Sequence, residues 1–425
     1  MSFPKSVEVR IWGEIVGYLA KLSNGKIQFE YESTFLNSGL EVSPVEMPLK
    51  TTRKFTQKNP AVTFRGLPGV IADCLPDRFG MRVIHEFYKK RYNLNPQEVD
   101  PIKLLLYVGD RSMGALEFSP TEIADDDDFL NQDLEITRLH SEAKKVLEGK
   151  ADEVTARIMR ISGSAGGARA KALIDFNPRK RLIRSGFSKA KSGFIPAIIK
   201  FDGVKDGEEE NCYGRLEYIY SLMAKKCGIH MPQTYLLEEN GRAHFIVERF
   251  DRNEKKEKIA HFASLCGLTG FDFYQKHSCS YEELFQYVSY LTNDASQVIE
   301  AFKIMVFNII FKNQDDHTKN FGFLMDQKGK WSFAPAYDLN YAYDAVQADT
   351  HQMKMNFKDD EFERHDFIVT GKKFGLKEKQ VNEILDRTLA CTEEFLKVCE
   401  ENSLEIDFAE GVHRNFRTYL KISAD

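Results

Sequence analysis

The sequence predicts an α+β fold in which a strand-rich first part precedes a helical second part. Up to about residue 252, short stretches of alternating apolar and polar residues recur between glycine-containing loops, which is typical of paired strands. From Tyr281 onward, apolar residues recur at helical spacing over long segments. The 425 residues leave room for two or three domains, because a domain commonly holds about 150 residues.

The first part begins with strands and continues with a helical segment. Residues 7–20, VEVRIWGEIVGYLA, predict two paired strands with a tight turn, and IQFEYES predicts another strand. Between residues 73 and 107 the pattern becomes helical, with one apolar face. The acidic run Asp125–Asp128 is typical of a solvated linker, so a boundary is expected there. The predicted division is a small N-terminal α/β subdomain (1–122), a β-rich nucleotide-binding lobe (129–252) and a helical catalytic lobe (253–425).

Composition and charge exclude several classes of protein. The formal net charge of −5 gives no overall basic field for nucleic acid. The seven cysteines form no CxxC pair and no Cys/His cluster at zinc-ligand spacing, which favours reduced thiols in the cytosol. The start MSFPKSVEVR lacks the apolar core of a signal peptide, and no stretch reaches the roughly 18 apolar residues of a membrane span. We therefore expect a soluble, cytoplasmic protein without a membrane partner.

A dense polar segment, NQDDHTKN at residues 313–320, follows the strongly apolar FKIMVFNIIF. Asp315 and Asn320 have four residues between them, which is the D-x-x-x-x-N spacing of a kinase catalytic loop. In such a loop the Asp accepts the proton of the substrate hydroxyl and the Asn binds magnesium. The alternative is a polar loop that only caps the preceding helix.

A second carboxylate follows at the distance that a kinase requires. Asp338, in APAYDLN, lies eighteen residues after Asn320 and takes the place of the Asp of a DFG motif, although the Phe and Gly are missing. Oxygen ligands suit a hard cation, so Asn320 and Asp338 are the candidate Mg²⁺ ligands. Within the same loop, we expect His317 to order the loop by hydrogen bonding and Lys319 to neutralise transferring phosphate.

A glycine-rich segment precedes these motifs. SGSAGGARAKALI, residues 162–174, contains Gly163, Gly166 and Gly167, and glycine lets backbone N–H groups approach phosphate oxygens closely. The spacing matches neither G-x-x-x-x-G-K-[ST] nor G-x-G-x-x-G, so a hairpin turn without a ligand is the alternative.

The strands and helix that follow could complete a nucleotide site. FIPAIIKFD predicts a buried strand ending in Lys200, from which a lysine can reach the α- and β-phosphates of a nucleotide. Its expected partner is Glu217, on the helix of RLEYIYSLMAKKCG; the alternative is a snorkelling lysine and a solvated glutamate. AHFIVERFDR, residues 243–252, predicts the strand that links the lobes. Its backbone near Glu248–Phe250 could pair with adenine, or it is an ordinary edge strand.

Arg160–Lys191 is rich in basic residues. Such a stretch could bind nucleic acid, but no aromatic residues are interleaved to stack on bases. Phosphate neutralisation or a solvated hairpin is therefore the preferred interpretation.

Taken together, these motifs resemble the HipA-type serine/threonine kinases, the toxins of bacterial type II toxin–antitoxin modules. SAGGARAKAL resembles the family's glycine-rich loop, and IIKFD, VERFDR, DDHTKNF and AYDLN resemble its later motifs in the same order. GLPGVIADCLPDRFG and VGYLAKLSNGKIQFEY resemble its N-terminal subdomain. The resemblance implies a two-lobed, protein-kinase-like fold that uses ATP and Mg²⁺. It also implies a small helix-turn-helix antitoxin as partner, contact with DNA only through that complex, and a protein substrate in the translation machinery.

The resemblance also implies roles for individual residues. Asp315 is the catalytic base, Asn320 and Asp338 hold magnesium, and Ser164 is the loop serine that such kinases autophosphorylate, with Ser162 as the competing acceptor. Arg169 stands where the family often has Gln, and Ala170 where an acidic residue is common, so the loop departs from the family pattern. The implied ATP contacts are Gly163, Ser164, Gly166, Gly167, Ala168, Lys171, Lys200, Glu217, Glu248, Arg249, Phe250, His317 and Lys319.

Two other functions remain as alternatives. One is a small-molecule kinase of related fold, against which the N-terminal subdomain and VERFDR argue. The other is a catalytically silent module that only joins a repressor complex, against which the presence of Asp315, Asn320 and Asp338 argues. If the kinase prediction holds, Mg-ATP is expected to bind between the two lobes.

Overall fold

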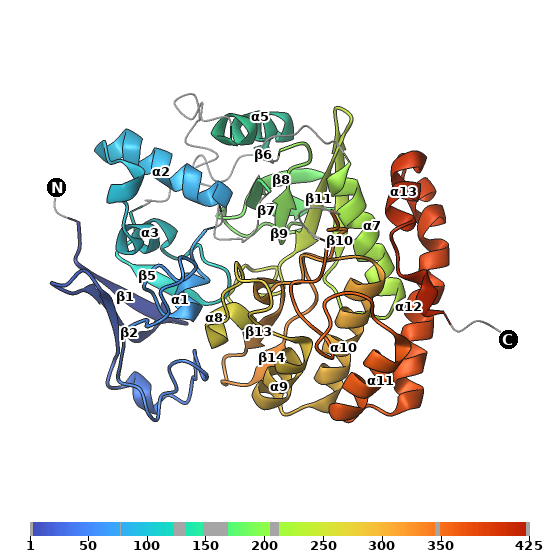
Figure 1. Cartoon of the computed structure of the whole chain (residues 1–425). Coiled ribbons are helices and arrows are strands. Elements are labelled where there is room, and N and C mark those ends of the chain that lie inside the picture. The colour runs from blue at the N-terminus through green and yellow to red at the C-terminus, as the bar shows by residue number, and fades with distance from the viewer. Residues whose placement is uncertain are drawn as a thin grey trace. The chain divides into compact units, whose positions relative to one another are not determined.

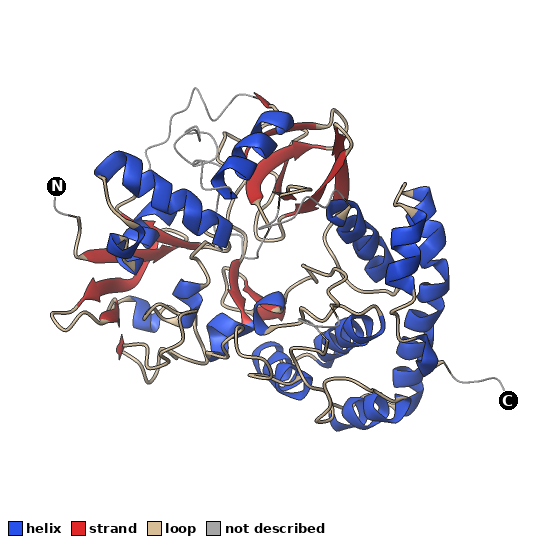
Figure 2. Cartoon of the chain, turned by 45° about the horizontal axis from the view of Figure 1, so that its top comes forward, coloured by secondary structure: helices blue, strands red, loops and turns tan. Residues whose placement is uncertain are grey.

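The computed structural model describes residues 3–76, 78–122, 133–147, 169–204, 212–344 and 349–421. The chain forms two compact units (Figure 1). Unit 1 comprises residues 1–211, 235–270 and 324–330, and unit 2 comprises residues 212–234, 271–323 and 331–425. The larger sheets belong to unit 1 and the longest helices to unit 2, as the colouring of Figure 2 shows.

Unit 1 begins with a five-stranded sheet in the order β4-β3-β2-β1-β5. Its strands are β1 (Ser6–Ile11), β2 (Glu14–Lys21), β3 (Ile27–Tyr31), β4 (Lys54–Phe55) and β5 (Leu116–Ser119). The predicted tight turn is confirmed, because Trp12 and Gly13 connect β1 and β2 with φ values of 47° and 87°. Positive φ at both central residues is the geometry of a type I′ hairpin, whose twist matches that of the strands.

Short helices follow in the same unit. They are α1 (Gly69–Ala72), α2 (Arg78–Tyr92) and α3 (Pro101–Val108), with the 3₁₀ turns η1 (Phe35–Asn37) and η2 (Pro96–Glu98). The start of α3 is specified locally, since Asp100 accepts a hydrogen bond from the Lys103 N–H at 3.1 Å and proline occupies the first helical position. The helical pattern predicted between residues 73 and 107 is thus divided between α2 and α3.

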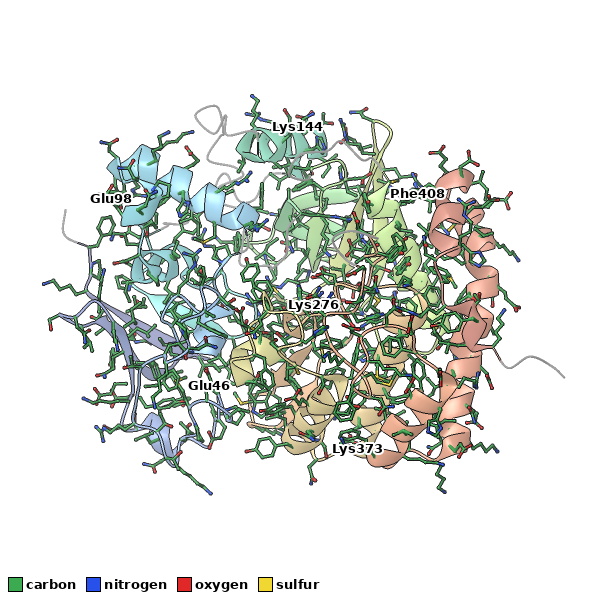
Figure 3. The ribbon with its side chains drawn as sticks, viewed as in Figure 1. Glu46, Glu98, Lys144, Lys276, Lys373 and Phe408 are labelled. Atoms are coloured by element: carbon green, nitrogen blue, oxygen red, sulfur yellow. The ribbon has the colours of Figure 1, made fainter. Side chains whose placement is uncertain are left out.

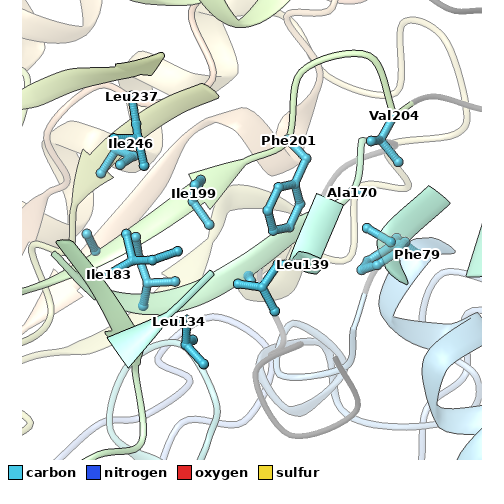
Figure 4. Close-up of a cluster of buried hydrophobic side chains, with 14 of the residues drawn as sticks. Phe79, Leu134, Leu139, Ala170, Ile183, Ile199, Phe201, Val204, Leu237 and Ile246 are labelled. Atoms are coloured by element: carbon cyan, nitrogen blue, oxygen red, sulfur yellow. The ribbon is translucent and has the colours of Figure 1, made fainter. Parts of the chain in front are cut away.

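A six-stranded sheet, in the order β10-β11-β9-β7-β8-β6, forms the second part of unit 1. Its strands are β6 (Asp133–Leu134), β7 (Lys171–Asn177), β8 (Leu182–Ser185), β9 (Ile195–Lys200), β10 (Thr234–Glu239) and β11 (Arg242–Glu248). Apolar side chains on one face, among them Ile183, Ile199 and Phe201, meet Leu139 of α5 (Ile136–Leu147) and Phe79 of α2 in a buried cluster (Figure 4). Lys171 and Lys200 alternate with these apolar residues along β7 and β9 and so belong to the opposite face.

Unit 2 is built around helices that pack through aromatic side chains. The helices are α7 (Tyr213–Lys226), α9 (Tyr281–Thr292), α10 (Ala295–Ile310), α11 (Arg364–Lys373), α12 (Glu378–Glu401) and α13 (Ile406–His413). Tyr220 of α7 is fully buried among Phe311, Phe395 and Phe416. At the other end of the same helix, Tyr213 meets the ring of Phe408, labelled in Figure 3, edge to face at 6.2 Å.

The remaining elements are short. They are β12 (His261–Ser264), α8 (Leu265–Thr269), η4 (Thr318–Asn320), β13 (Gly322–Met325), β14 (Trp331–Phe333) and η5 (Thr418–Leu420). None of the helices in the described part of the chain has the length and apolar character needed to cross a membrane.

The α+β prediction is confirmed, as are the strand ending at Lys200 and the helix ahead of the polar loop. The strand predicted over residues 243–252 is present but ends at Glu248. The acidic run Asp125–Asp128 lies outside the described residues. The three-domain division stays a prediction. The basic stretch does not form one exposed face in its described part, because Lys171 is only 5% exposed and Arg184 only 3%.

Candidate active site

The polar loop of residues 313–320, called the 313–320 loop below, begins where a fully packed helix ends. Helix α10 starts at a conventional N-cap, where Asp294 accepts from the Ser296 N–H at 2.9 Å, and then buries nearly every apolar side chain. It ends because Lys312 takes a positive φ of 55°, which the helix cannot continue. The chain therefore leaves the helical path here but stays largely buried, and Asp315 is the one exposed residue of the 313–320 loop.

Asp315 presents its carboxylate to solvent within this loop. Its side chain is 65% exposed, and the backbone beneath it is held by Asn320, whose amide Nδ2 donates to the Asp315 carbonyl oxygen at 2.7 Å. The Nε2 of His317 lies 3.6 Å from Asp315 Oδ1, and the His317 ring packs edge-on against Phe273 at 5.1 Å. Lys319 places its ammonium 4.8 Å from the centre of the same Phe273 ring. The loop thus displays a carboxylate beside an imidazole and an ammonium group.

The neighbouring Asp316 has the opposite environment. It is fully buried and accepts hydrogen bonds from the Tyr281 hydroxyl at 2.6 Å, the Gln352 N–H at 2.8 Å and Nδ1 of His351 at 2.8 Å. Burial opposes ionisation, but the adjacent His351, Tyr281 and Gln352 outweigh it, so the pKa of Asp316 lies below its ordinary value. Asp316 is therefore an anchor for the loop.

The proton on His351 can be assigned from its other neighbour. Nε2 of His351 lies 2.9 Å from the guanidinium of Arg417, which has only donors, so Nε2 accepts and Nδ1 carries the proton that is donated to Asp316. Burial lowers the pKa of His351, which agrees with a neutral imidazole. Arg417 also donates to the Ile309 carbonyl at 2.6 Å and pairs with Asp360, so the end of α10 is tied to the same network.

The segment around Asp338 meets the 313–320 loop. The Tyr337 hydroxyl donates to the Lys319 carbonyl at 2.7 Å, and Asn320, Tyr337 and Leu339 line one small hollow of about 10 Å³. Asp338 itself has a φ of 53°, a left-handed conformation that costs free energy for a residue with a side chain. The structure thus brings Asn320 close to the segment that carries Asp338, as the spacing predicts.

The donor chemistry of this group fits magnesium better than a metal held by protein alone. The described residues contain no cluster of three or more His, Cys, Asp or Glu side chains that could hold a metal. An Asn and an Asp leave most coordination positions to phosphate oxygens and water, which is how Mg²⁺ is commonly bound in phosphoryl-transfer enzymes.

In unit 1, two lysines lie directly opposite each other on the six-stranded sheet. Lys171 of β7 pairs with Lys200 of β9 in the antiparallel register, and Lys200 in turn pairs with Phe245 of β11. The Lys200 ammonium lies 5.7 Å from the centre of the Phe245 ring.

The other residues predicted to contact the nucleotide include several that the structure does not describe. Gly163, Ser164, Gly166, Gly167 and Ala168 lie outside the described residues, as does Ser162. Glu217 is 2% exposed in α7, so it is not the solvated glutamate of the alternative interpretation. Lys200 and Glu217 belong to different units, and their pairing stays a prediction.

The VERFDR segment has a structural role that the sequence did not reveal. The backbone N–H of Arg249 donates to the Pro196 carbonyl at 2.9 Å. The Arg249 guanidinium donates to both carboxylate oxygens of Asp251, at 2.9 and 2.7 Å. Arg252 donates to the same carboxylate at 2.8 Å, and the Gly114 N–H does so at 2.7 Å. The two guanidinium groups and the N–H outweigh burial and lower the pKa of Asp251 to about 2. The Arg249 side chain thus serves the fold.

Glu248 and Phe250 of the same segment are also predicted to contact the nucleotide. Glu248, at the end of β11, accepts from the Tyr235 hydroxyl at 2.7 Å. Phe250 packs against Phe262 with ring centres 5.9 Å apart. Their contact with adenine stays a prediction.

The sequence patterns did not predict the hydrogen-bond partners of the two buried carboxylates, Asp316 and Asp251. His351 and Arg417 had no distinguishing local pattern, because each is a single residue far along the chain from Asp316. For Asp251 a signal was present, since a carboxylate between two arginines directly after a buried strand is typical of a buried ion cluster.

Comparisons with known proteins agree with this architecture. The curated relatives include "Putative kinase Y4mE" of Sinorhizobium fredii, 25% identical over 152 residues, which are 34% of each chain. They also include a "Putative kinase" of Haemophilus influenzae, 27% identical over 201 residues, which are 39% of this chain and 58% of that protein. The match thus spans about a third of the first relative's length and somewhat over half of the second's.

A solved structure shares the fold over almost the whole chain. HipA of Shewanella oneidensis MR-1, from a complex with HipB and operator DNA, superposes with a TM-score of 0.68 over 97% of this chain and 96% of that one, at 17% identity. The family model for the HipA N-terminal domain matches residues 7–119, and the model for the HipA-like C-terminal domain matches residues 163–395. Because the two models together span most of the sequence, the chain belongs to the HipA family.

Proposed function

We propose that this chain is an ATP- and Mg²⁺-dependent serine/threonine protein kinase that acts as the toxin of a toxin–antitoxin module. Membership of the HipA family supports the proposal, and so do the names of the two curated relatives. The observation that carries it is the contrast between two adjacent carboxylates: Asp316 is locked in the core, and Asp315 is held out to solvent on the loop that Asp316 anchors.

The chemistry assigned to Asp315 is that of a general base. Its carboxylate accepts the proton of a substrate serine or threonine hydroxyl while that oxygen bonds to the γ-phosphorus and ADP leaves. Asn320 and Asp338 are the proposed ligands of Mg²⁺, which when bound supplies positive charge against the phosphate oxygens. His317 lies beside the Asp315 carboxylate, and Lys319 of the same loop is proposed to counter developing negative charge.

Phosphate binding is assigned to the lysine pair on the six-stranded sheet. Lys171 and Lys200, at paired positions of neighbouring strands, are proposed to supply the positive charge that the α- and β-phosphates of ATP need, because charge-assisted hydrogen bonds to phosphate are strong. Glu248 and Phe250, at the end of β11, are the proposed contacts to adenine.

We extend the proposal to regulation at Ser164. A phosphate on this serine adds about −1.5 to −2 charges to the glycine-rich segment that is proposed to bind the ATP phosphates, and like charges repel strongly at close range. Autophosphorylation at Ser164 is therefore expected to lower ATP affinity and switch the enzyme off. Phosphopeptide mapping after incubation with Mg-ATP decides between Ser164 and Ser162, and equal ATP affinities of the two forms would remove the regulatory role.

The partner is proposed by analogy with the structural relative. That protein was solved with HipB and operator DNA, so a helix-turn-helix antitoxin is the expected partner of this chain, with DNA reached only through that complex. The protein substrate is proposed to belong to the translation machinery. Co-purification with the product of the adjacent reading frame tests the antitoxin, and phosphopeptide analysis of ribosome-associated proteins tests the substrate.

The central test combines binding and transfer. Calorimetry with Mg²⁺ and ATP should show binding to the folded chain, and Lys200→Ala should weaken it because a phosphate contact is lost. Labelled γ-phosphate should then appear on protein serine or threonine. Absence of binding at millimolar ATP would overturn the kinase proposal, and binding without transfer to any protein would favour a silent module or a small-molecule kinase.

A further inference from the structure

Two cysteines that are far apart in sequence lie against each other in unit 2. Cys227 follows directly on the last residue of α7, Lys226, and Cys391 lies in the middle of α12; each is 5% exposed. Lys226 contacts two residues of α12, one before and one after Cys391 in the sequence. Its carbonyl accepts from the Arg387 guanidinium at 3.0 and 3.2 Å, and its ammonium lies 2.6 Å from the Glu394 carboxylate. Figure 1 shows α7 and α12 running next to each other at this point.

The residues on both sides of Cys227 lie against Arg387, which is one helical turn before Cys391 on α12. Both thiols are buried, and each perturbs the ionisation of the other, which places them within interaction range. The chain is also pressed closely onto the helix here, because a Cβ atom added at Gly228 would lie 2.9 Å from the Arg387 guanidinium. Neither cysteine is bonded to another residue through a disulfide in the structure.

The surroundings give the two thiols different reactivity. The hydrogen bond from Cys227 lowers the pKa of Cys391, helped by the nearby Arg387 and Lys226, while burial and Glu394 oppose the shift. The same hydrogen bond and burial raise the pKa of Cys227. A thiolate is the reactive form of cysteine, so the lowered pKa favours Cys391 over Cys227 as the thiol that reacts first.

We propose that Cys227 and Cys391 form a redox-modification site, in which a peroxide converts the two thiols into a disulfide that joins α7 to α12. The Cys391 thiolate attacks one oxygen of hydrogen peroxide, the O–O bond breaks, and a sulfenic acid forms while the departing hydroxide takes a proton to become water. The Cys227 sulfur then attacks the sulfenyl sulfur, and the hydroxyl leaves as a second water with the Cys227 proton. Two thiols are oxidised and one peroxide is reduced.

The proposal is independent of the kinase function, because it requires only the two side chains and a peroxide. Its structural consequence is a covalent link between α12 and α7, the helix that carries Glu217. A cross-link between residues so distant in sequence removes much of the freedom of the unfolded chain, so the oxidised protein should melt at a higher temperature.

The experiment treats the folded full-length chain with hydrogen peroxide, blocks the remaining thiols, and maps the peptides by mass spectrometry without reduction. The expected product is one cross-linked peptide pair containing Cys227 and Cys391, with two of the seven thiols lost and both recovered by dithiothreitol. The melting temperature should rise on oxidation and fall back on reduction.

Three variants make the assignment sharp. In Cys227→Ser, the sulfenic acid on Cys391 has no partner and should be trapped by dimedone. In Cys391→Ser, Cys227 should stay reduced. Cys399→Ser is the matched control on the same helix: burial raises the pKa of Cys399 to about 12, and the Cys227–Cys391 cross-link should form unchanged in that variant. Retention of both thiols in the folded wild type, or equal labelling of Cys227 by dimedone in Cys391→Ser, would overturn the proposal.

Discussion

At the scale of single residues, burial gives adjacent side chains opposite tasks. Asp315 and Asp316 have the same chemistry, yet one side chain is 65% exposed and the other is fully buried. A group that is exposed can be changed with little effect on folding, whereas a buried carboxylate with three donors cannot be removed without leaving those donors unsatisfied. This difference makes the two residues a natural pair for separating catalysis from stability.

Asp315→Asn should abolish most phosphoryl transfer while the protein remains folded and binds Mg-ATP. A base that acts in the transition state affects kcat, and its loss typically costs about 10²–10⁴-fold. Asp316→Asn is the comparison variant, because its main effect should be to lower the free energy of unfolding. Transfer rates and urea unfolding of both variants test this, and near-wild-type transfer by Asp315→Asn would place the base elsewhere.

Asp251→Asn should be strongly destabilising, by about 3–5 kcal/mol, because it leaves two buried guanidinium groups without their carboxylate. The pKa of Asp251, about 2, lies below the ordinary value of 3.8, so its contribution is present above pH 3.8 and is lost as the pH falls toward 2. Denaturant unfolding measures the change. Glu254→Gln is the control, since Glu254 is exposed on the same segment.

At the scale of elements, hydrogen bonds from distant segments hold the 313–320 loop in shape. Tyr281 at the start of α9 and His351 both donate to Asp316, while Arg417 joins His351 to the end of α10. The shape of the loop therefore depends on side chains from separate elements, and such networks help to make a local conformation unique.

Tyr281→Phe should lower the free energy of unfolding by about 1–3 kcal/mol, because Asp316 loses one of its buried donors. It should also reduce phosphoryl transfer, since the loop beneath Asp315 is less firmly held. Tyr290→Phe on the same helix is the matched control, as Tyr290 is 66% exposed. Equal behaviour of the two variants in urea unfolding would show that the Tyr281 hydroxyl does not stabilise the loop.

At the scale of the whole molecule, buried histidines couple stability to pH. Burial lowers the pKa of His244 and of His261 to about 4, from an ordinary value of 6.5, and both belong to unit 1. Each is neutral in the folded state: Nδ1 of His244 accepts from the Asp202 N–H at 3.0 Å. Protonation of these rings thus requires a proton to enter the core or the chain to unfold.

We expect the stability of the protein to fall between pH 6.5 and pH 4. In this window the unfolded chain binds protons that the folded chain does not, so unfolding becomes more favourable as the pH falls. Denaturant midpoints at pH 7.5, 6.0 and 5.0 test this. His244→Gln should flatten the dependence, and His230→Gln, at an exposed position, should leave it unchanged. A steeper slope in His244→Gln would contradict the assignment.

Much of the fold could be predicted because it depends on local patterns. Alternation predicted the strands before residue 252, and the tight turn followed from a glycine between two alternating runs. Asp315, Asn320 and Asp338 are identified as candidate residues by their spacing alone, and their roles stay a prediction. The structure agrees in placing Asn320 beside the segment that carries Asp338.

Only the tertiary structure decided which neighbours these residues have. The packing leaves the Asp315 carboxylate exposed and buries that of Asp316. It also places Arg249 in a buried ion cluster and brings Cys227 near Cys391. The physical reason is that a local pattern fixes which face of an element is buried, but not which distant side chain packs on it. Hydrogen-bond partners, and therefore pKa values and reactivity, follow from that packing.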